Sequence, residues 1–415
     1  MSGVRIALVS DYYLPTLGGV QTVVKAHREA LTEAGHEVTV FAPLAEPSTD
    51  PGVVALPVSG VFRPDGFPFA WPPAGVEDAL RAEFASRRVE VVHVHSEMFA
   101  ALGGFGAART LGLPVVQTMH GRVDVYTRHV LPMPALTTVL LAALHGRRLP
   151  HGPPVRGGTP YTRTRLARRM WRLMVSHANA ADHVIVPSRH FAAKLLDQGV
   201  TTPVSVLSNG LEASVLDAVG MPAVRRPHGD LRVMWCGRMS PEKRPEVFVD
   251  AVAATPGVRA TMFGDGMALR RVRARASRAG GRIALRGSVP QADVLAGMRA
   301  HDVFVSSSYD FDNQPMVMLE AVASGLPVVH LDPDLAEVVP DGGGLLAASP
   351  DAAGLAATLA GLRDAPARVA AMSEVLVEAR GVASQERHLA GLLDAYEAAI
   401  RRHQERRSAP GVSSA

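Results

Sequence analysis

Short apolar runs alternate with helical segments along most of this chain, and this alternation limits the fold more than any other feature of the sequence. Apolar runs at 5–10 and 36–42 flank a helical segment at 20–34, which ends before Gly35. A strand, a helix and a second parallel strand in this order build parallel sheets with helices packed over them. The sequence therefore predicts an α/β fold.

The pattern occurs twice, as expected for a chain of 415 residues, because single domains rarely grow so large. In the first half, further strands are predicted at 90–95, 114–119, 181–186 and 203–207. A second set starts at 231–236 and continues with strands at 259–263, 283–285 and 303–305. We expect two Rossmann-like domains, at 1–212 and 231–384, that face each other across a cleft at the carboxyl ends of their strands.

Three segments lie outside this pattern. Residues 213–230 are weakly patterned, contain Gly and Pro, and are predicted to link the two domains. Residues 125–172 are rich in Arg, Pro and Gly and are predicted to form a mobile surface loop flanked by helices. A last helix is predicted at 385–405, followed by a disordered tail at 406–415.

Composition narrows the compartment and the partners. Cys236 is the single cysteine, so an internal disulfide is excluded, a reducing cytoplasm is expected, and we interpret Cys236 as a buried structural thiol. The first residues lack the pattern of a signal peptide, and no stretch reaches the roughly 18 apolar residues that a membrane span needs. The net charge of +4 is modest and base-stacking aromatics are scarce, so we expect no nucleic-acid partner.

The stretch at 306–329 has the most informative order of residues. A buried strand leads to a polar loop, and Pro315 opens a predicted helix at 316–324. Asp312 precedes this helix and Glu320 lies in its second turn. Because a helix N-terminus attracts anions, these carboxylates could bind the hydroxyls of a sugar whose diphosphate docks on the helix end. An ordinary surface loop with a capping acid fits the spacing equally well.

Two cations follow the first strand of the second half. Arg238 and Lys243 lie in the segment GRMSPEK, where Ser240 can cap a helix and Pro241 can start it. Arg offers phosphate a bidentate fork and Lys offers a point charge. A cation in the first turn of a helix opposes the helix dipole, so Lys243 at that position favours an anionic ligand. The alternative is that both are solvated surface cations.

These cations could neutralise a diphosphate without a metal, and we expect neither a metal nor another cofactor. The chain has no HExxH motif and no paired cysteines. Asp310 and Asp312 could nevertheless chelate Mg²⁺. Both interpretations stay open at this point.

Polar residues also follow a strand of the first half. His120 ends the strand at 114–119, where its ring could donate to a sugar hydroxyl, although a lone histidine is often structural. Asp124 and Tyr126 come next and could bind an acceptor hydroxyl.

Glycines follow two other strands. Gly18 and Gly19 lie between the first strand and the first helix, and Gly264 follows the strand at 259–263. Glycine lets the backbone of a loop approach a phosphate or a sugar closely. A simple turn is the alternative at each position.

The segment RTRLARRMWR at 163–172 places Leu166, Met170 and Trp171 among five arginines. Such a helix could lie on an anionic membrane surface. A solvated helix that packs its apolar residues on the core is the favoured interpretation.

Taken together, the motifs resemble those of the retaining glycosyltransferases of family 4, which have the GT-B fold. The resemblance covers nearly the whole chain and rests on RIALVSDYYLPTLGGVQTVV, VVHVHS, VVQTMH, WCGRMSPEKRPEVFVDAV, FGDGMALRRV and DNQPMVMLEAVASGLPVV. It implies transfer of a hexosyl group from a UDP- or GDP-linked sugar to an acceptor hydroxyl, with retention of configuration and without a metal. It also implies that the last helix crosses back to the first domain.

The resemblance implies roles for individual residues. Arg238 and Lys243 would bind the donor diphosphate, where charge develops as the bond to the sugar breaks. Glu320 would bind the ribose, and Asp312 and His120 would contact the donor sugar. Further donor contacts would come from Gly18, Gly19, Gly237, Gly264, Gln314 and the backbone amides of Met316 and Val317.

Two residues depart from the family pattern. Asp312 stands where the family usually has Glu, which shortens the side chain by one methylene, and Pro315 stands where it usually has Gly, which removes one N–H. These departures keep a non-catalytic sugar-nucleotide-binding protein open as an alternative. A glycoside hydrolase that uses Asp312 and Glu320 as its acid and base is the other alternative.

The acceptor is expected to be a small molecule, a glycan or a lipid. Gln314, with His120, Asp124 and Tyr126, looks more like the branch of the family that glycosylates membrane lipids. The arginine-rich segment at 163–172 would then make a peripheral contact with the inner face of an anionic membrane.

Overall fold

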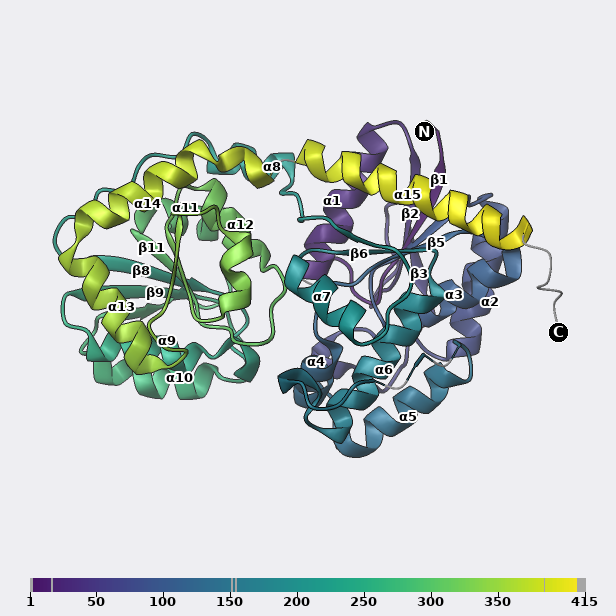
Figure 1. Cartoon of the computed structure of the whole chain (residues 1–415), viewed down its shortest axis with the longest axis horizontal. Coiled ribbons are helices and arrows are strands. Elements are labelled where there is room, and N and C mark those ends of the chain that lie inside the picture. Colours follow the sequence, from purple (N-terminus) through teal and green to yellow (C-terminus); the bar gives the residue numbers. More distant parts are fainter. Residues whose placement is uncertain (1–2, 16–17, 151, 154, 384, 409–415) are drawn as a thin grey trace. The chain divides into compact units, whose positions relative to one another are not determined.

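The computed structural model describes residues 3–15, 18–150, 152–153, 155–383 and 385–408, which form two compact units (Figure 1). The first unit contains Met1–Gly210 and Glu386–Ala415, and the second contains Leu211–Gln385. Each unit has its own parallel sheet and its own core.

Seven parallel strands form the sheet of the first unit, in the order β3-β2-β1-β4-β5-β6-β7. In the centre, Ile6 of β1 pairs with Val38 of β2 on one side and with Val91 of β4 on the other. Both faces of the central strands are buried, which is why these strands are nearly continuous apolar runs in the sequence. The strands are β1 Arg5–Val9, β2 Glu37–Pro43, β3 Val53–Leu56, β4 Val91–Val94, β5 Val115–Thr118, β6 His183–Val186 and β7 Val204–Val206.

Helices cover both faces of this sheet. The face covered by α1 (Gly19–Glu33) and α15 (Gln385–Ser408) has its own core, in which Leu392 and Tyr396 of α15 are fully buried. The opposite face is covered by α2 (Pro73–Ser86), α3 (Phe99–Leu111), α6 (Arg165–Ala180) and α7 (Arg189–Asp197). Two further helices, α4 (Val123–Val130) and α5 (Pro134–Gly146), pack against α6.

Six parallel strands form the sheet of the second unit, in the order β10-β9-β8-β11-β12-β13. Helices α9, α10 and α13 cover one face, and α8, α11 and α12 cover the other. The strands are β8 Leu231–Cys236, β9 Val258–Phe263, β10 Ile283–Leu285, β11 Val303–Ser306, β12 Val328–His330 and β13 Gly344–Leu346. The helices are α8 Ala213–Val219, α9 Pro245–Ala254, α10 Leu269–Ala276, α11 Gln291–Ala300, α12 Met316–Ala323, α13 Ala352–Asp364 and α14 Pro366–Glu378.

The predicted surface loop at 125–172 is wrong for most of its length. It contains most of α4, all of α5 and the start of α6. Met170 and Trp171 are fully buried in the core of the first unit, although arginines flank them in the sequence. His151 and Pro154, in the glycine- and proline-rich part of this segment, lie outside the described residues.

The predicted linker at 213–230 belongs to the second unit and starts with α8. Val215 and Val219 of α8 are buried in the same core as α11 and α12, which is why this segment is part of the unit rather than a spacer. At the other end of the chain, α15 continues to Ser408, three residues into the predicted tail, and residues 409–415 lie outside the described part. No helix among the described residues is long and apolar enough to span a membrane.

Candidate active site

The loop after β8 carries both predicted cations, Arg238 and Lys243. A single 3-10 turn spans Pro241–Lys243, and Arg244 then adopts a left-handed conformation with φ of 51°. Helix α9 starts only at Pro245. The predicted helix start at Pro241 is therefore wrong, because Lys243 ends a short turn and does not lie in the first turn of a helix. The argument from the helix dipole does not apply to it.

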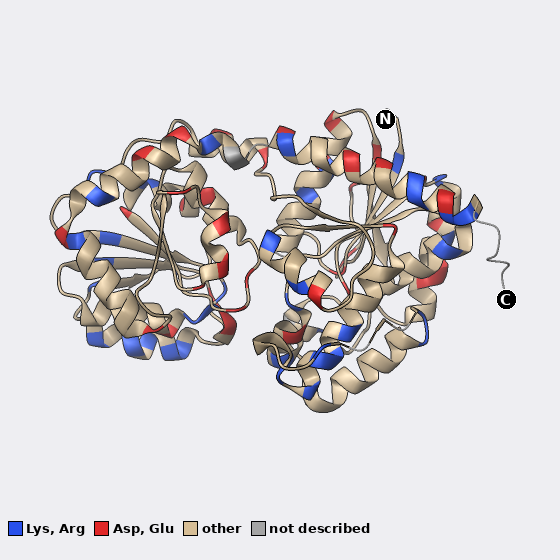
Figure 2. Ribbon diagram, viewed as in Figure 1, with Lys and Arg blue, Asp and Glu red and all other residues tan. Residues whose placement is uncertain are grey.

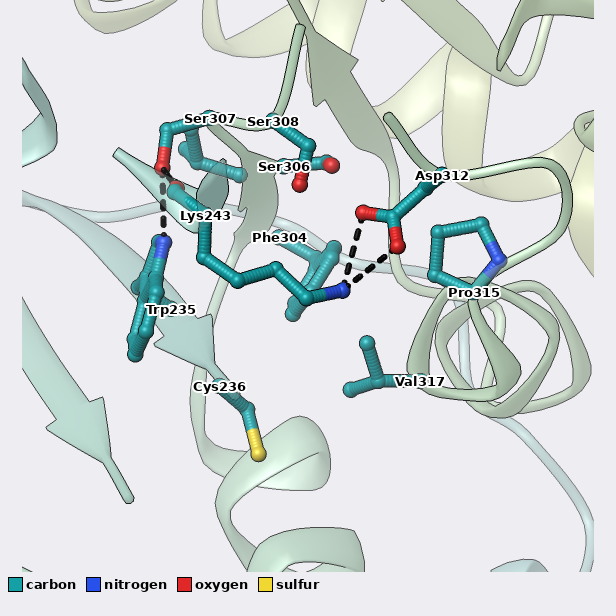
Figure 3. A pocket seen from close by; sticks show the side chains of 11 residues that line it. Trp235, Cys236, Lys243, Phe304, Ser306, Ser307, Ser308, Asp312, Pro315 and Val317 are labelled. Atoms are coloured by element: carbon teal, nitrogen blue, oxygen red, sulfur yellow. Dashed lines mark hydrogen bonds and ion pairs between the residues drawn. The ribbon is translucent and has the colours of Figure 1, made fainter. Parts of the chain in front are cut away.

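Lys243 forms a two-pronged ion pair with Asp312, and both side chains are largely buried (Figure 3). Its Nζ lies 2.6 Å from Oδ1 and 2.9 Å from Oδ2 of Asp312. Strands β8 and β11 are neighbours in the sheet, so the loops that follow them leave from the same edge. The hydroxyl of Ser307 donates to the carbonyl of Lys243 at 2.6 Å and accepts from Nε1 of Trp235 at 2.9 Å. These bonds hold the backbone of Lys243 in place.

Arg238 is held by a carboxylate that sequence analysis did not identify. Its Nη2 lies 3.2 Å from Oε1 of the buried Glu242, and the hydroxyl of Ser240 donates to the same oxygen at 2.6 Å. The signal for Glu242 was present in the sequence, since it follows Pro241 within the same short motif. Each predicted cation thus has a carboxylate partner, and a bound anion would compete with that partner.

Glycines let the loop after β8 touch the loop after β9. A Cβ placed on Gly264 would lie 1.9 Å from the carbonyl oxygen of Gly237, and one on Gly266 would lie 2.6 Å from that of Met239. The N–H of Met239 donates to the carbonyl of Asp265 at 2.7 Å. Close backbone packing therefore requires glycine at 264 and 266, whether or not a ligand binds there.

Helix α12 presents its N-terminus next to this ion pair. Pro315 is its N-cap, with φ of −66° and ψ of 124°, and the carbonyl of Pro315 accepts from the N–H of Met318 at 2.9 Å. Helix geometry leaves the N–H groups of Met316 and Val317 without partners inside the helix. Val317 lines the same small pocket as Lys243 and Asp312 (Figure 3). One of these two amide donors, that of Val317, therefore belongs to a residue that lines the pocket together with Lys243.

Glu320 lies in the second turn of α12 and is 6% exposed. Its Oε1 accepts a hydrogen bond from Nε2 of Gln291, at the start of α11, at 2.7 Å. Burial raises the pKa of Glu320, and the bond from Gln291 opposes this effect. Gln291 was not identified from the sequence, because only the packing of α11 against α12 brings it near Glu320.

The remaining lining of the pocket is small, polar or apolar. The lining residues are Trp235, Cys236, Lys243, Phe304, Val305, Ser306, Ser307, Ser308, Asp312, Pro315 and Val317 (Figure 3). Cys236 is half-buried, less than expected, and burial raises the pKa of its thiol to about 12. The thiol is therefore protonated at neutral pH.

In the first unit, His120 follows β5 and packs against a second histidine. Its Nε2 lies 3.1 Å from Nδ1 of His95, and the two rings stack with their centroids 5.4 Å apart. Burial lowers the pKa of His120 to about 3. The ring is therefore neutral near pH 7 and can take part in hydrogen bonds without carrying a charge.

Asp124 lies in the first turn of α4, and both its carboxylate oxygens accept from Arg122, from Nε at 2.7 Å and from Nη2 at 2.8 Å. Both residues are buried, and the guanidinium also stacks over Trp171 at 5.5 Å. An acceptor hydroxyl would have to compete with Arg122 for Asp124. The ring of Tyr126 packs edge-on against Tyr12, with their centroids 6.2 Å apart.

The other predicted donor contacts are placed as follows. Gly19 is the first residue of α1 and Gly18 is its N-cap, whose carbonyl accepts from the N–H of Thr22 at 3.1 Å. Residues 16–17 of the same loop lie outside the described residues. Gln314 is half-buried in the loop before α12.

Comparison with known proteins adds to this geometry. The model for Glycosyltransferase Family 4 matches residues 17–215, and the model for Glycosyl transferases group 1 matches residues 230–364. A GDP-mannose-dependent alpha-mannosyltransferase of Mycobacterium tuberculosis is 28% identical over 344 residues, which cover 80% of each chain. The alpha-monoglucosyldiacylglycerol synthase of Streptococcus pneumoniae is 23% identical over 360 residues, which cover 81% of this chain and 73% of the relative.

The chain belongs to glycosyltransferase family 4. It is a hexosyltransferase, and it has the GT-B fold. The sucrose-phosphate synthase structure from Thermosynechococcus elongatus, which supports this fold, has a TM-score of 0.68 and 19% identity, covering 97% of this chain and 98% of that one.

For this glycosyltransferase, membership of the family favours sugar transfer over the two alternatives considered from the sequence, a glycoside hydrolase and a non-catalytic binding protein. The geometry agrees with this choice. Asp312 is tied to Lys243 and Glu320 to Gln291, whereas a hydrolase needs one carboxyl group free to protonate a leaving oxygen and a second to attack or to activate water.

Proposed function

We propose that this glycosyltransferase moves a hexosyl group from a nucleoside-diphosphate sugar to a hydroxyl of a lipid or glycolipid acceptor, with retention of configuration. The observation that carries the proposal is the placement of Lys243 and the N-terminus of α12 around one pocket of the second unit. A diphosphate is the ligand that this arrangement suits best, because it can take an ammonium group and backbone amides at once. GDP-mannose is the first donor to test, since the name of the M. tuberculosis mannosyltransferase gives it as the donor of that enzyme. UDP-sugars are the second donors to test.

The chemistry then depends on the leaving group. As the bond between the sugar and the diphosphate breaks, negative charge grows on the phosphate oxygens, and Arg238 and Lys243 stabilise it there. The diphosphate displaces Asp312 from Lys243 and Glu242 from Arg238, so that both carboxylates release a cation to the ligand. Asp312, once released, can contact the donor sugar.

The other donor contacts follow the resemblance to the family. Glu320 accepts from a ribose hydroxyl in place of the bond from Gln291, and the amides of Met316 and Val317 donate to phosphate. The neutral ring of His120 exchanges a hydrogen bond with a sugar hydroxyl. Retention requires that the acceptor attack from the face that the diphosphate leaves, and the departing phosphate then takes the acceptor proton.

No metal takes part in this proposed reaction. Two protein cations already meet the charge of a diphosphate, which is the role that a divalent ion plays in many other phosphate sites. Of the acidic pair Asp310 and Asp312, Asp312 already binds Lys243 through its carboxylate.

A lipid acceptor is supported by the surface of the first unit. Helix α5 exposes Leu136, Val139 and Leu140 on one side, preceded by the exposed Met133. Most of α5 is tan in Figure 2, and blue basic segments lie on the adjacent α4 and α6. An exposed apolar stripe bordered by arginines suits the surface of an anionic membrane.

The contact proposed for 163–172 changes in one respect. In α6, Met170 and Trp171 are buried in the core and Leu166 packs against it, so this helix contributes only its arginines. The apolar part of the membrane contact comes from α5. We propose a cytoplasmic protein that binds the inner face of the membrane through α5 and the arginines around it.

A direct transfer assay tests the proposal. Purified protein is mixed with radiolabelled GDP-mannose or UDP-glucose and with vesicles that contain phosphatidylinositol or diacylglycerol, and the lipid fraction is analysed. We expect label in a lipid product with one donor and not with the other. Free sugar without any lipid product, with every donor and acceptor, would contradict the proposal.

A further inference from the structure

Four buried histidines gather on the face of the first sheet that α1 and α15 cover. They are His27 of α1, His93 of β4, His95 just after β4, and His388 of α15. Residues two apart on an extended chain point to the same side, so His93 and His95 both face α1. The ring centroids of His93 and His95 are 4.0 Å apart, and the ring of His27 lies 5.6 Å from the first and 5.0 Å from the second.

The hydrogen bonds fix the tautomer of His27. Nδ1 of His388 lies 2.7 Å from the carbonyl oxygen of Ser208, and a carbonyl can only accept, so this nitrogen carries the proton. In a neutral ring, Nε2 of His388 is then an acceptor, and Nε2 of His27, which contacts it, must donate. Nδ1 of His27 is left as a bare lone pair.

This lone pair is buried and has no hydrogen-bond partner among the described residues. Nε2 of His95 is in the same situation, while Nδ1 of His95 bonds to His120. His93 has two hydroxyl neighbours, Tyr396 at 2.8 Å from Nδ1 and Thr118 at 2.7 Å from Nε2. Buried polar atoms without partners are rare in folded proteins, and two of them side by side point to a missing ligand.

We propose that His27, His93 and His95 bind one divalent transition-metal ion of the zinc class. One ring nitrogen from each of the three lies within 4.8 Å of the other two. Neutral imidazole nitrogens suit Zn²⁺, Co²⁺ or Ni²⁺, whereas Mg²⁺ and Ca²⁺ prefer oxygen. Zinc bonds to nitrogen are about 2.0–2.1 Å long, so the rings move closer together when the ion binds.

The surroundings of the three histidines match those of metal ligands in proteins. A histidine that binds a metal usually donates its other N–H to a neighbouring group, which fixes its orientation. His388 takes this role for His27, His120 for His95, and the hydroxyl of Tyr396 or Thr118 for His93. Because the ligands come from α1 and from the end of β4, and two of their partners, His388 and Tyr396, come from α15, the ion fastens the last helix to the first sheet. Its role is structural.

The test is a metal count on protein purified without a histidine tag. The protein is stripped with a chelator, dialysed against micromolar Zn²⁺, and analysed by mass spectrometry for zinc. We expect about one zinc ion per chain, bound at least about tenfold more weakly in His27→Gln and in His95→Gln. Substitution with Co²⁺ should give the visible absorption of a nitrogen-ligated site, and this absorption should be absent from both variants. Zn²⁺ should raise the melting temperature of the wild type and not that of the variants.

His177→Gln is the matched control, because His177 is fully buried in the same unit, both its ring nitrogens lack hydrogen-bond partners among the residues that the structure describes, and it lies outside the cluster. This variant should bind zinc like the wild type. Circular dichroism shows which variants are folded, and His95→Gln serves if His27→Gln is not. Less than about 0.1 zinc ion per wild-type chain, or equal zinc binding in folded His27→Gln or His95→Gln and the wild type, would overturn the proposal. Either result leaves the proposed transfer reaction untouched.

Discussion

The ammonium group of Lys243 and the carboxylate of Asp312 hold each other at 2.6 and 2.9 Å across two loops that are 69 residues apart in the sequence. The pair forms because β8 and β11 are adjacent parallel strands whose carboxyl ends reach the same edge of the sheet. It keeps a cation ready for a diphosphate and places the acid where it can contact the sugar once the cation is taken.

Replacing Asp312 tests whether the carboxylate acts in transfer or only neutralises Lys243. We expect Asp312→Ala to lower kcat by about 100-fold, the order of magnitude for loss of one preorganised polar group. Asp312→Glu, which restores the residue usual in the family, should retain activity within about tenfold of the wild type. The measurement is the initial rate of transfer at saturating donor. Equal rates for Asp312→Ala and the wild type would remove Asp312 from the mechanism.

Pro315 lacks the N–H that glycine would offer at the start of α12. Its φ of −66° and ψ of 124° are open to other residues, so Pro315→Gly and Pro315→Ala should both fold. Each adds one amide donor to the phosphate site, and we expect donor affinity to rise by up to about tenfold. The glycine variant should also lose about 0.5–1 kcal/mol of stability through the freer unfolded chain. If both variants bind donor no better than the wild type, the phosphate does not lie at this helix end.

His120 tests the contribution of the first unit. Its ring is neutral because burial lowers its pKa to about 3, so its contact with the sugar is a hydrogen bond and not an ion pair. His120→Ala should lower kcat/KM by about 10- to 100-fold, in line with a lost hydrogen bond to the transition state. Between pH 5.5 and 8, the dependence of kcat/KM on pH should have the same shape in the wild type and in His120→Ala, without a rise or fall that only the wild type shows. A rise or fall that is present in the wild type and absent from His120→Ala would show that His120 titrates in the neutral range and that this account of its role is wrong.

The buried His330, at the end of β12, makes stability depend on pH. Its Nδ1–H donates to the carbonyl of Asp332 at 2.7 Å, and burial lowers its pKa below the ordinary 6.5. Below pH 6.5, His330 binds a proton in the unfolded chain but not in the folded protein. Its contribution to the free energy of unfolding is therefore present above this pH and is lost as the pH falls. Between pH 7 and 5.5 the wild type should lose more stability than His330→Gln, by at most about 1.4 kcal/mol per pH unit.

Urea unfolding at the two pH values measures this loss for the wild type and for His330→Gln. His228→Gln is the control, because His228 is exposed and should leave the slope unchanged. An equal loss in His330→Gln and the wild type would show that His330 already titrates normally in the folded protein.

The membrane surface can be tested without an acceptor. Leu136→Asp combined with Leu140→Asp places two charges on the exposed stripe of α5, where the leucines are 54% and 56% exposed. Binding to vesicles with anionic lipid should fall by at least about tenfold, because apolar insertion is lost and like charges repel the membrane. Leu196→Asp, at a leucine that is 53% exposed on α7, should bind like the wild type. Sedimentation with vesicles measures both, and equal loss in the control would mean that the surface is not specific.

The alternation of strands and helices could be predicted from the sequence because strands buried on both faces are apolar throughout. The strand predicted at 231–236 coincides with β8, and the helix predicted at 20–34 matches α1, Gly19–Glu33, to within one residue. The start of the helix after β8 could not be predicted in the same way. Ser240 and Pro241 have the composition of a helix start, but the left-handed conformation of Arg244 delays the helix until Pro245.

Some residues of the candidate site could likewise be predicted from the sequence, and others could not. Arg238, Lys243, Asp312 and Glu320 could be named from their motifs and from their places at the ends of strands. Their partners could not, because Gln291 reaches Glu320 only through the packing of α11 and α12 in one core. The buried pair of Arg122 and Asp124 was also missed, since burial of the α4–α6 region depends on tertiary contacts that no local pattern signals.

The most direct test of the central claim is a calorimetric titration of GDP-mannose, and then of UDP-glucose, into the wild type, Lys243→Ala and Lys25→Ala. Lys25 is a partly exposed lysine of α1, paired with Glu29, and serves as the matched control. The account predicts that one donor binds the wild type and Lys25→Ala equally, and that Lys243→Ala binds it about 10- to 100-fold more weakly, as expected for a lost charge-assisted bond to phosphate. Equal donor affinity in Lys243→Ala and the wild type would contradict it.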